Sequence, residues 1–259
     1  EIGYASVVST ERGVLVLGGE NANGLTARAY LLNVRKKQSG VGFDAVEFDQ
    51  QIPDLPAACK GGGAAVIGDY VYLVAGEMLD AAGVANGSRV IWRLNLKKVS
   101  LDPELDVNQQ TELWEPLPGW PTEGPPRMFP LVSSQHDGFT DRLLVFSGRY
   151  FPEGKDHADA NNLKFLTDAW SFDPARFSGK GDDGDNSGSW KKIADCPVPM
   201  TAGTAVAYGP AHVVVPGYAT GEILATQLKS GIPMRDFDHP GFPKIAYAYH
   251  TITDSWTEF

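Results

Sequence analysis

The stretch RGVLVLGGEN, residues 12–21, runs from four aliphatic residues directly into two glycines and a carboxylate. The same pattern returns as VYLVAGE at 71–77, LLVFSGR at 143–149 and VVVPGY at 213–218. Short apolar runs of this kind indicate strands buried on both faces, and a glycine at the strand end is typical of a place where another backbone comes close. We therefore expect one strand to occur four times, with equivalent glycines at Gly19, Gly76, Gly148 and Gly217.

The flanks of this strand repeat as well. A short strand precedes each copy, beginning near Gly3, Gly61, Arg127 and Met200. A segment of alternating apolar and polar residues follows each copy, at 29–34, 90–96, 168–174 and 245–251. A fourth strand then contains Trp114, Trp190 or Trp256, whereas the first unit has FDAVEFDQQIPDLP in that place. Alternation with a period of two indicates half-buried strands.

Four antiparallel strands repeated four times, with proline-rich junctions, predict an all-β protein of the β-propeller class. We expect one propeller domain over residues 1–259, with blades at about 1–57, 58–122, 123–198 and 199–259. The remaining residues are expected to form loops, and a composition of 29 glycines and 18 prolines does not favour helix.

Charge and cysteine content exclude several classes of function. The formal net charge of −10, without a long basic cluster, argues against nucleic acid and anionic membranes as partners. No run approaches the roughly 18 apolar residues of a membrane span. Cys59 and Cys196 are expected to be isolated thiols near strand starts. A small anionic molecule is still allowed, because a pocket can be locally basic.

The repeats resemble those of the kelch family in their glycine-ended second strand, aromatic third strand and tryptophan in the fourth. Longer stretches are similar to bacterial sialic acid mutarotases, kelch proteins that speed the interconversion of N-acetylneuraminate anomers. These stretches are GPPRMFPLVSS at 124–134, DRLLVFSGRYF at 141–151, FLTDAWSFDP at 165–174 and SWKKIADCPVPMTAG at 189–203. The opening blade, GYASVVSTERGVLVLGGE, resembles one found near the C-terminal end of those proteins, so the blade order resembles that of the cyclically permuted branch.

This resemblance implies several expectations. The family has six blades, so we expect these four to be part of a six-bladed propeller and the family's catalytic glutamate to lie beyond Phe259; a propeller that closes with four blades is the alternative. It also implies a periplasmic or secreted protein; because the chain begins at Glu1 without a leader, we expect it to be a processed or trimmed product. The implied partner is a small acidic sugar.

Mutarotation requires proton transfer at the ring oxygen and the anomeric hydroxyl, which a carboxylic acid and a base can perform without metal or organic cofactor. An acidic sugar also needs a cation for its carboxylate, and arginine can bind that group with two hydrogen bonds. Ligand sites of propellers usually lie in the loops that enter the first strand and leave the second. The candidate ligand contacts in those loops are Arg127, Arg149, Glu77, Glu20 and Lys60.

Arg127 is the predicted anchor of the sugar carboxylate, and Tyr218 is the expected counterpart of Glu20 in the fourth blade. The five histidines have no metal-ligand spacing, and the acidic turn DDGDNSG at 182–188 lacks the terminal glutamate of a calcium loop.

Two other functions are compatible with the repeats. A non-catalytic kelch propeller would bind a carbohydrate or protein partner, with an exposed apolar patch as its expected signature, to which RYFPEG at 149–154 could contribute. A galactose-oxidase-like propeller would need a copper site of tyrosines and histidines, which the sequence does not display.

Overall fold

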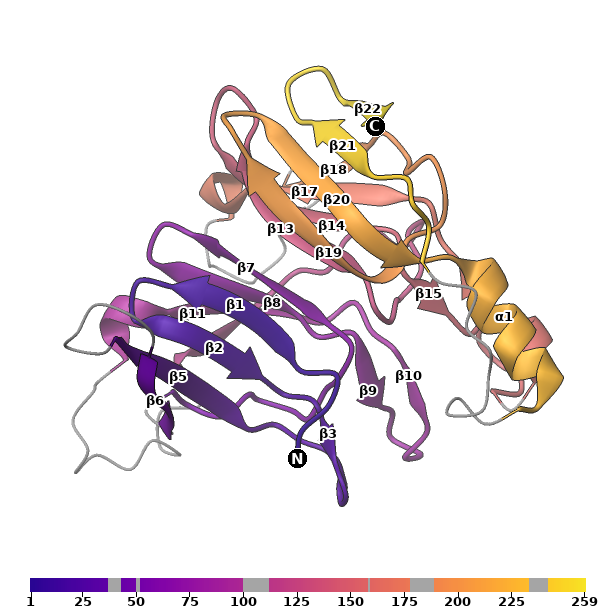
Figure 1. The fold of residues 1–259 in the computed structure, drawn as a ribbon, viewed down its shortest axis with the longest axis horizontal. Helices are drawn as coiled ribbons and strands as arrows, with labels where there is room; N and C mark the ends of the chain where they lie inside the picture. The colour runs from indigo at the N-terminus through magenta and orange to yellow at the C-terminus, as the bar shows by residue number, and fades with distance from the viewer. Residues whose placement is uncertain (37–42, 50–51, 100–111, 158, 178–188, 233–241) are drawn as a thin grey trace. The chain divides into compact units, whose positions relative to one another are not determined.

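The computed structural model describes residues 1–36, 43–49, 52–99, 112–157, 159–177, 189–232 and 242–259 (Figure 1). The chain forms two compact units, one of residues 1–85 with 90–117 and the other of residues 86–89 with 118–259. Each unit contains two four-stranded antiparallel sheets, and the strands of each sheet follow one another along the chain.

Unit 1 contains the first two blades. The first sheet consists of β1 (Ser6–Thr10), β2 (Gly13–Leu17), β5 (Ala29–Lys36) and β6 (Phe43–Asp49). The second consists of β7 (Gly63–Ile67), β8 (Tyr70–Val74), β11 (Ile91–Asn95) and β12 (Trp114–Leu117). The first strands β1 and β7 adjoin. Leu15 and Leu17 of the first sheet pack with Val71, Leu73 and other buried residues of the second in one core.

Unit 2 repeats the arrangement. Its first sheet consists of β13 (Leu131–His136), β14 (Asp141–Phe146), β17 (Ala169–Phe172) and β18 (Trp190–Ile193). Its second consists of β19 (Thr201–Tyr208), β20 (His212–Ala219), β21 (Tyr247–His250) and β22 (Ser255–Glu258). The first strands β13 and β19 adjoin, and Leu144 and Phe146 share a core with Val213 and Val215.

The predicted fold class is therefore confirmed: the chain is an all-β propeller protein with four blades of four antiparallel strands. Every strand expected in a blade is present. The number of blades in the complete propeller stays a prediction.

The connections between the strands of a blade contain structure where loops were expected. Short hairpins pair β3 (Glu20–Asn21) with β4 (Gly24–Leu25), β9 (Glu77–Leu79) with β10 (Ala85–Gly87), and β15 (Arg149–Tyr150) with β16 (Lys164–Phe165). Three 3-10 turns, η1 (Leu96–Lys98), η3 (Ala160–Asn162) and η4 (Pro174–Arg176), begin after Asn95, Asp159 and Asp173, whose side chains accept a backbone N–H.

In the fourth blade residues 221–230 form an α-helix, so the prediction of a loop was wrong for this part of the connection. Helix α1 (Gly221–Ser230) follows β20 directly and contacts η3 of the third blade (Figure 1). Its sequence, GEILATQLKS, consists mostly of good helix formers. It ends at Gly231, whose φ of 65° is the left-handed conformation common after helix ends.

The strand-end glycines behave as predicted in three blades. Gly19, Gly76 and Gly148 have φ angles of 108°, 75° and 104°. A Cβ atom on any of them would lie 2.4–2.9 Å from a carbonyl oxygen. Gly217 differs, because it has no positive φ and a Cβ atom there would meet nothing within 4 Å.

Candidate functional site

Three equivalent backbone bridges define the end of the blades where the site was predicted. Gly3 pairs with Glu20, Lys60 with Glu77, and Met128 with Arg149. Glu20, Glu77 and Arg149 therefore occupy equivalent positions in their blades. On the partner strand, Lys60 is the equivalent of Met128. Arg127 precedes Met128 by one residue, so Lys60 and Arg127 are not equivalent. We call these positions the rim.

The fourth blade requires a correction. Thr201 of β19 pairs with Ala219 of β20, as Met128 pairs with Arg149 in the third blade. The counterpart of Glu20 is therefore Ala219 and not Tyr218, and Tyr218 takes the place of Gly148. The predicted register was one residue out because β20 continues through Gly217 to Ala219, whereas the other second strands end before their glycine.

Lys60 joins two rim glutamates in unit 1. Its Nζ lies 2.9 Å from Oε2 of Glu20 and 3.3 Å from Oε1 of Glu77. The ring of Tyr4 lies near the same ammonium, with its centroid 5.9 Å from Nζ. Burial by itself would lower the pKa of Lys60, but its hydrogen bonds and charge interactions with the two glutamates outweigh this effect and raise the pKa above its usual value. Lys60 is thus a cation at neutral pH.

Arg127 is completely buried in unit 2, with 0% of its surface exposed. Its Nη2 lies 2.7 Å from Oδ2 of Asp168, and its Nη1 donates to the carbonyl of Ser147 at 3.0 Å. Its guanidinium carbon also lies 4.6 Å from the centre of the Trp120 ring. The role of Arg127 as carboxylate anchor stays a prediction, and this burial argues for a positioning role instead.

No local sequence pattern points to the partners of Arg127. Asp168, at the start of the third strand, also accepts a hydrogen bond from Trp170 Nε1 at 2.6 Å. The second carboxylate oxygen of Asp168 and Nε of Arg127 are buried without a hydrogen-bond partner among the described residues. The pair is 41 residues apart in the chain, so no local pattern could have revealed it.

Arg149 is half-buried on the rim of unit 2. Its guanidinium carbon lies 4.5 Å from the centre of the Phe129 ring, an arrangement that holds a guanidinium by cation–π attraction. The next aromatic residue, Phe151, stacks on His157 with a centroid distance of 4.4 Å. Of the two predicted arginines, Arg149 is the more accessible.

The two cysteines are free and buried, which confirms the prediction of isolated thiols. Burial raises the pKa of each to about 12, so neither is a thiolate nucleophile at neutral pH. The described residues contain no group of three or more histidine, cysteine or acidic side chains arranged to hold a metal ion. The acidic turn at 182–188 lies outside the described residues.

No protein-family model and no curated protein sequence matches the chain. Among solved structures, 166 chains are similar to it. One of them, described as "Structure of YjhT", has 18% sequence identity and a TM-score of 0.48, and the match covers 80% of this chain. The chain spans about half the length of that structure, since the match covers 53% of it.

Within the described part of the chain, no helix has the length and apolar character needed to cross a membrane.

Proposed function

We propose that the protein is a sugar mutarotase or epimerase that acts on N-acetylneuraminate or a related acidic sugar. The observation that supports this most is the Lys60 ammonium held between Glu20 and Glu77, which leave the second strands of two consecutive blades. This cluster contains both a cation and carboxylate bases at the rim. The resemblance of the repeats to the sialic acid mutarotases supports the choice of substrate.

The reaction needs only proton transfers. A base removes the proton of the anomeric hydroxyl while an acid protonates the ring oxygen; the bond between the anomeric carbon and the ring oxygen breaks, and ring closure on the other face gives the second anomer. No electron is gained or lost, so no redox partner is required. In this proposal the carboxylate of Glu20 or Glu77 is the base that takes the proton of the anomeric hydroxyl, and the Lys60 ammonium is the acid that protonates the ring oxygen. Ring closure returns both protons by the reverse transfers.

The predicted carboxylate contacts in unit 2 have separate roles. Within unit 2 taken by itself, Arg149, stacked on Phe129, is the candidate contact for a ligand carboxylate. Arg127 is the proposed positioning residue, because its guanidinium already binds Asp168 and the Ser147 carbonyl.

The test is the rate of anomer exchange of N-acetylneuraminate, measured by NMR with and without the 259-residue protein. We expect acceleration by the protein and a loss of about 10²-fold or more in Lys60→Met and Glu77→Gln, the usual size of a general acid–base contribution. Lys97→Met is the matched control, because Lys97 is exposed and pairs with Asp69. Circular dichroism verifies that each variant is folded.

Absence of acceleration by the unmodified protein would overturn the proposal. Equal losses in Lys60→Met and Lys97→Met would instead remove the rim cluster from it.

A second candidate is a non-catalytic binding propeller, favoured by an exposed apolar face on the fourth blade. Val206, Tyr208 and Phe259 are exposed there. Saturable binding of N-acetylneuraminate without faster anomer exchange would identify this alternative.

A further inference from the structure

A separate cavity of about 140 Å³ lies in unit 2, between the third and fourth blades. Strand β13 runs from the rim residue Met128 towards His136, and the turn that follows it begins at Asp137, which lines the cavity. The cavity is therefore at the opposite end of the strands from Arg149. Its lining includes Leu144 and Trp190 as well as several polar side chains.

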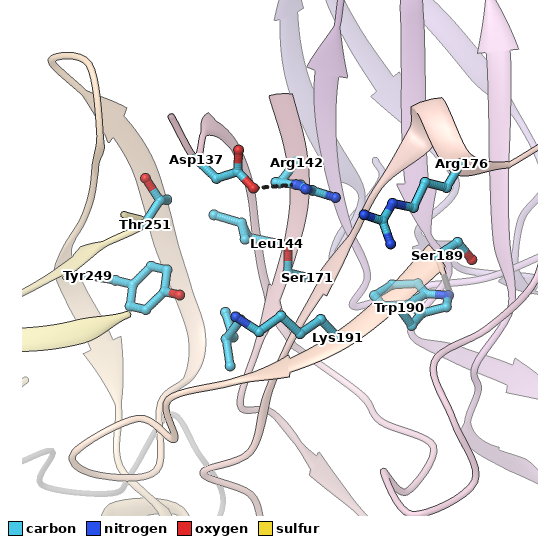
Figure 2. Close-up of a pocket in the computed structure, with 11 residues that line it drawn as sticks. Asp137, Arg142, Leu144, Ser171, Arg176, Ser189, Trp190, Lys191, Tyr249 and Thr251 are labelled. Carbon is cyan, nitrogen blue, oxygen red and sulfur yellow. Dashed lines mark hydrogen bonds and ion pairs between the residues drawn. The ribbon is translucent and has the colours of Figure 1, made fainter. Parts of the chain in front are cut away.

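Arg142 is the most firmly held polar group of the cavity (Figure 2). Its Nε lies 2.6 Å from Oδ2 of Asp137, and its Nη1 lies 2.5 Å from Oδ2 of Asp173. Because Arg142 has an ion pair on each side, its guanidinium has one orientation.

The two aspartates are themselves fixed by backbone groups. Oδ1 of Asp137 accepts from the N–H groups of Phe139 and Thr140 at 2.9 and 3.0 Å, and Oδ1 of Asp173 accepts from the N–H of Ala175 at 3.0 Å. Burial would raise the pKa of Asp137, but these backbone hydrogen bonds and Arg142 together lower it. The carboxylate oxygens are thus occupied, and Arg142 stays fixed at neutral pH.

The groups left to contact a ligand are mainly donors. Nη2 of Arg142 and the hydroxyl of Ser171 have no hydrogen-bond partner among the described residues. Lys191 extends along the cavity and is 4.0 Å from its nearest carboxylate, Asp254. Arg142, Lys191 and Ser171 all line the cavity, and a guanidinium, an ammonium and a hydroxyl are suited to a ligand rich in acceptors.

The size of the cavity limits the ligand. Pockets for drug-sized ligands usually exceed about 300 Å³. The cavity therefore suits an ion or a single charged group.

We propose that this cavity binds a small oxyanion, either free phosphate or the phosphate or carboxylate group of a small ligand, through Arg142, Lys191 and Ser171. The three cations of the cavity are balanced by nearby aspartates, so it has no excess of positive charge; these cations and aspartates are Arg142, Arg176 and Lys191 with Asp137, Asp173 and Asp254. Binding therefore depends on hydrogen bonds from donors with fixed directions. The site is independent of the rim cluster and of the proposed mutarotase activity.

The test is isothermal titration of the 259-residue protein with inorganic phosphate, with sodium chloride keeping the ionic strength constant. Parallel titrations with sulfate and acetate distinguish a tetrahedral oxyanion from a carboxylate. We expect saturable binding, weakened about tenfold or more in Lys191→Ala, as for the loss of a charge-assisted hydrogen bond. Ser171→Ala should weaken binding less, by about five- to tenfold.

Lys192→Ala is the matched control. Lys192 is adjacent to Lys191 in β18 and pairs with Asp195 at 3.3 Å, and successive residues of a strand point to opposite faces. This variant should bind phosphate as the unmodified protein does.

No saturable binding of any of the three anions overturns the proposal. Equal weakening in Lys191→Ala and Lys192→Ala also overturns it, because it would show attraction by surface charge alone. Unchanged binding in both Lys191→Ala and Ser171→Ala has the same consequence.

Discussion

A left-handed backbone conformation recurs at one position of all four blades. The φ angles there are 56° at Tyr4, 58° at Gly61, 53° at Phe129 and 50° at Ala202. In unit 1 the N–H of Gly61 donates to the carbonyl of Tyr4 at 2.8 Å, and in unit 2 the N–H of Ala202 donates to that of Phe129 at 3.3 Å. Residues with a side chain lose about 1–3 kcal/mol in this conformation. These hydrogen bonds between neighbouring blades explain why the left-handed conformation is retained beside the rim.

Gly76→Ala should destabilise the protein much more than Gly217→Ala. A Cβ atom at Gly76 would lie 2.4 Å from the carbonyl oxygen of Gly61, and its φ of 75° is unfavourable for alanine. The unfavourable φ alone predicts a loss of about 1–2 kcal/mol in the free energy of unfolding, and the steric clash with the Gly61 carbonyl increases the loss. Urea denaturation followed by circular dichroism measures the loss.

Gly217→Ala should change the free energy of unfolding by less than about 0.5 kcal/mol, because the added Cβ atom meets open space. Similar losses in both variants would refute the assignment of Gly76 to the close approach of two backbones.

At the scale of elements, each fourth-strand tryptophan joins its blade to the junction before it. Nε1 of Trp114 donates to the carbonyl of Pro53 at 3.0 Å, that of Trp190 to Pro118 at 2.9 Å, and that of Trp256 to Ala194 at 3.1 Å. The three buried or half-buried tryptophans thus share a repeated hydrogen bond. Because the acceptor is a backbone carbonyl, the bond does not depend on which side chains form the junction.

Trp114→Phe should cost more stability than Trp92→Phe. Both side chains are buried in the second blade and lose similar volume, but the described residues give the indole of Trp92 no hydrogen-bond partner. The difference in the free energy of unfolding should be about 1 kcal/mol or more, the net value of a buried hydrogen bond. Differential scanning calorimetry gives both values, and equal losses would show that the bond to Pro53 contributes nothing.

At the scale of the whole molecule, the third and fourth blades differ in what covers their corresponding faces. When the two blades are aligned on their fourth-strand tryptophans, the strand pairings match Leu144 of β14 with Val214 of β20. By the same alignment, Phe146 matches Pro216. Leu144 and Phe146 are buried against the fourth blade, whereas Val214 and Pro216 line an open apolar hollow. This hollow is part of the exposed apolar face of the fourth blade that also contains Val206, Tyr208 and Phe259.

Val215→Ala should destabilise the protein by about 2 kcal/mol, because Val215 is fully buried against the third blade. Val214→Ala, on the opposite face of the same strand, should cost less than about 1 kcal/mol. Thermal unfolding of both variants tests this expectation. A loss in Val214→Ala as large as that in Val215→Ala would mean that the open face is covered in solution.

The sequence by itself determined the four blades and their strands, because apolar alternation, strand-end glycines and tryptophans are local features that repeat. It also placed Glu20, Glu77 and Arg149 at equivalent rim positions. Helix α1 escaped prediction, since its ten residues are too short to stand out from a loop-rich segment.

Only the tertiary structure decided which charges meet. Lys60 reaches Glu20 across 40 residues and Arg127 reaches Asp168 across 41, so both pairs depend on the packing of strands and neighbouring blades. The cavity around Arg142 depends in the same way on side chains from two blades. Periodicity along a chain fixes the strands, but burial and pairing of charges are properties of contacts between distant segments.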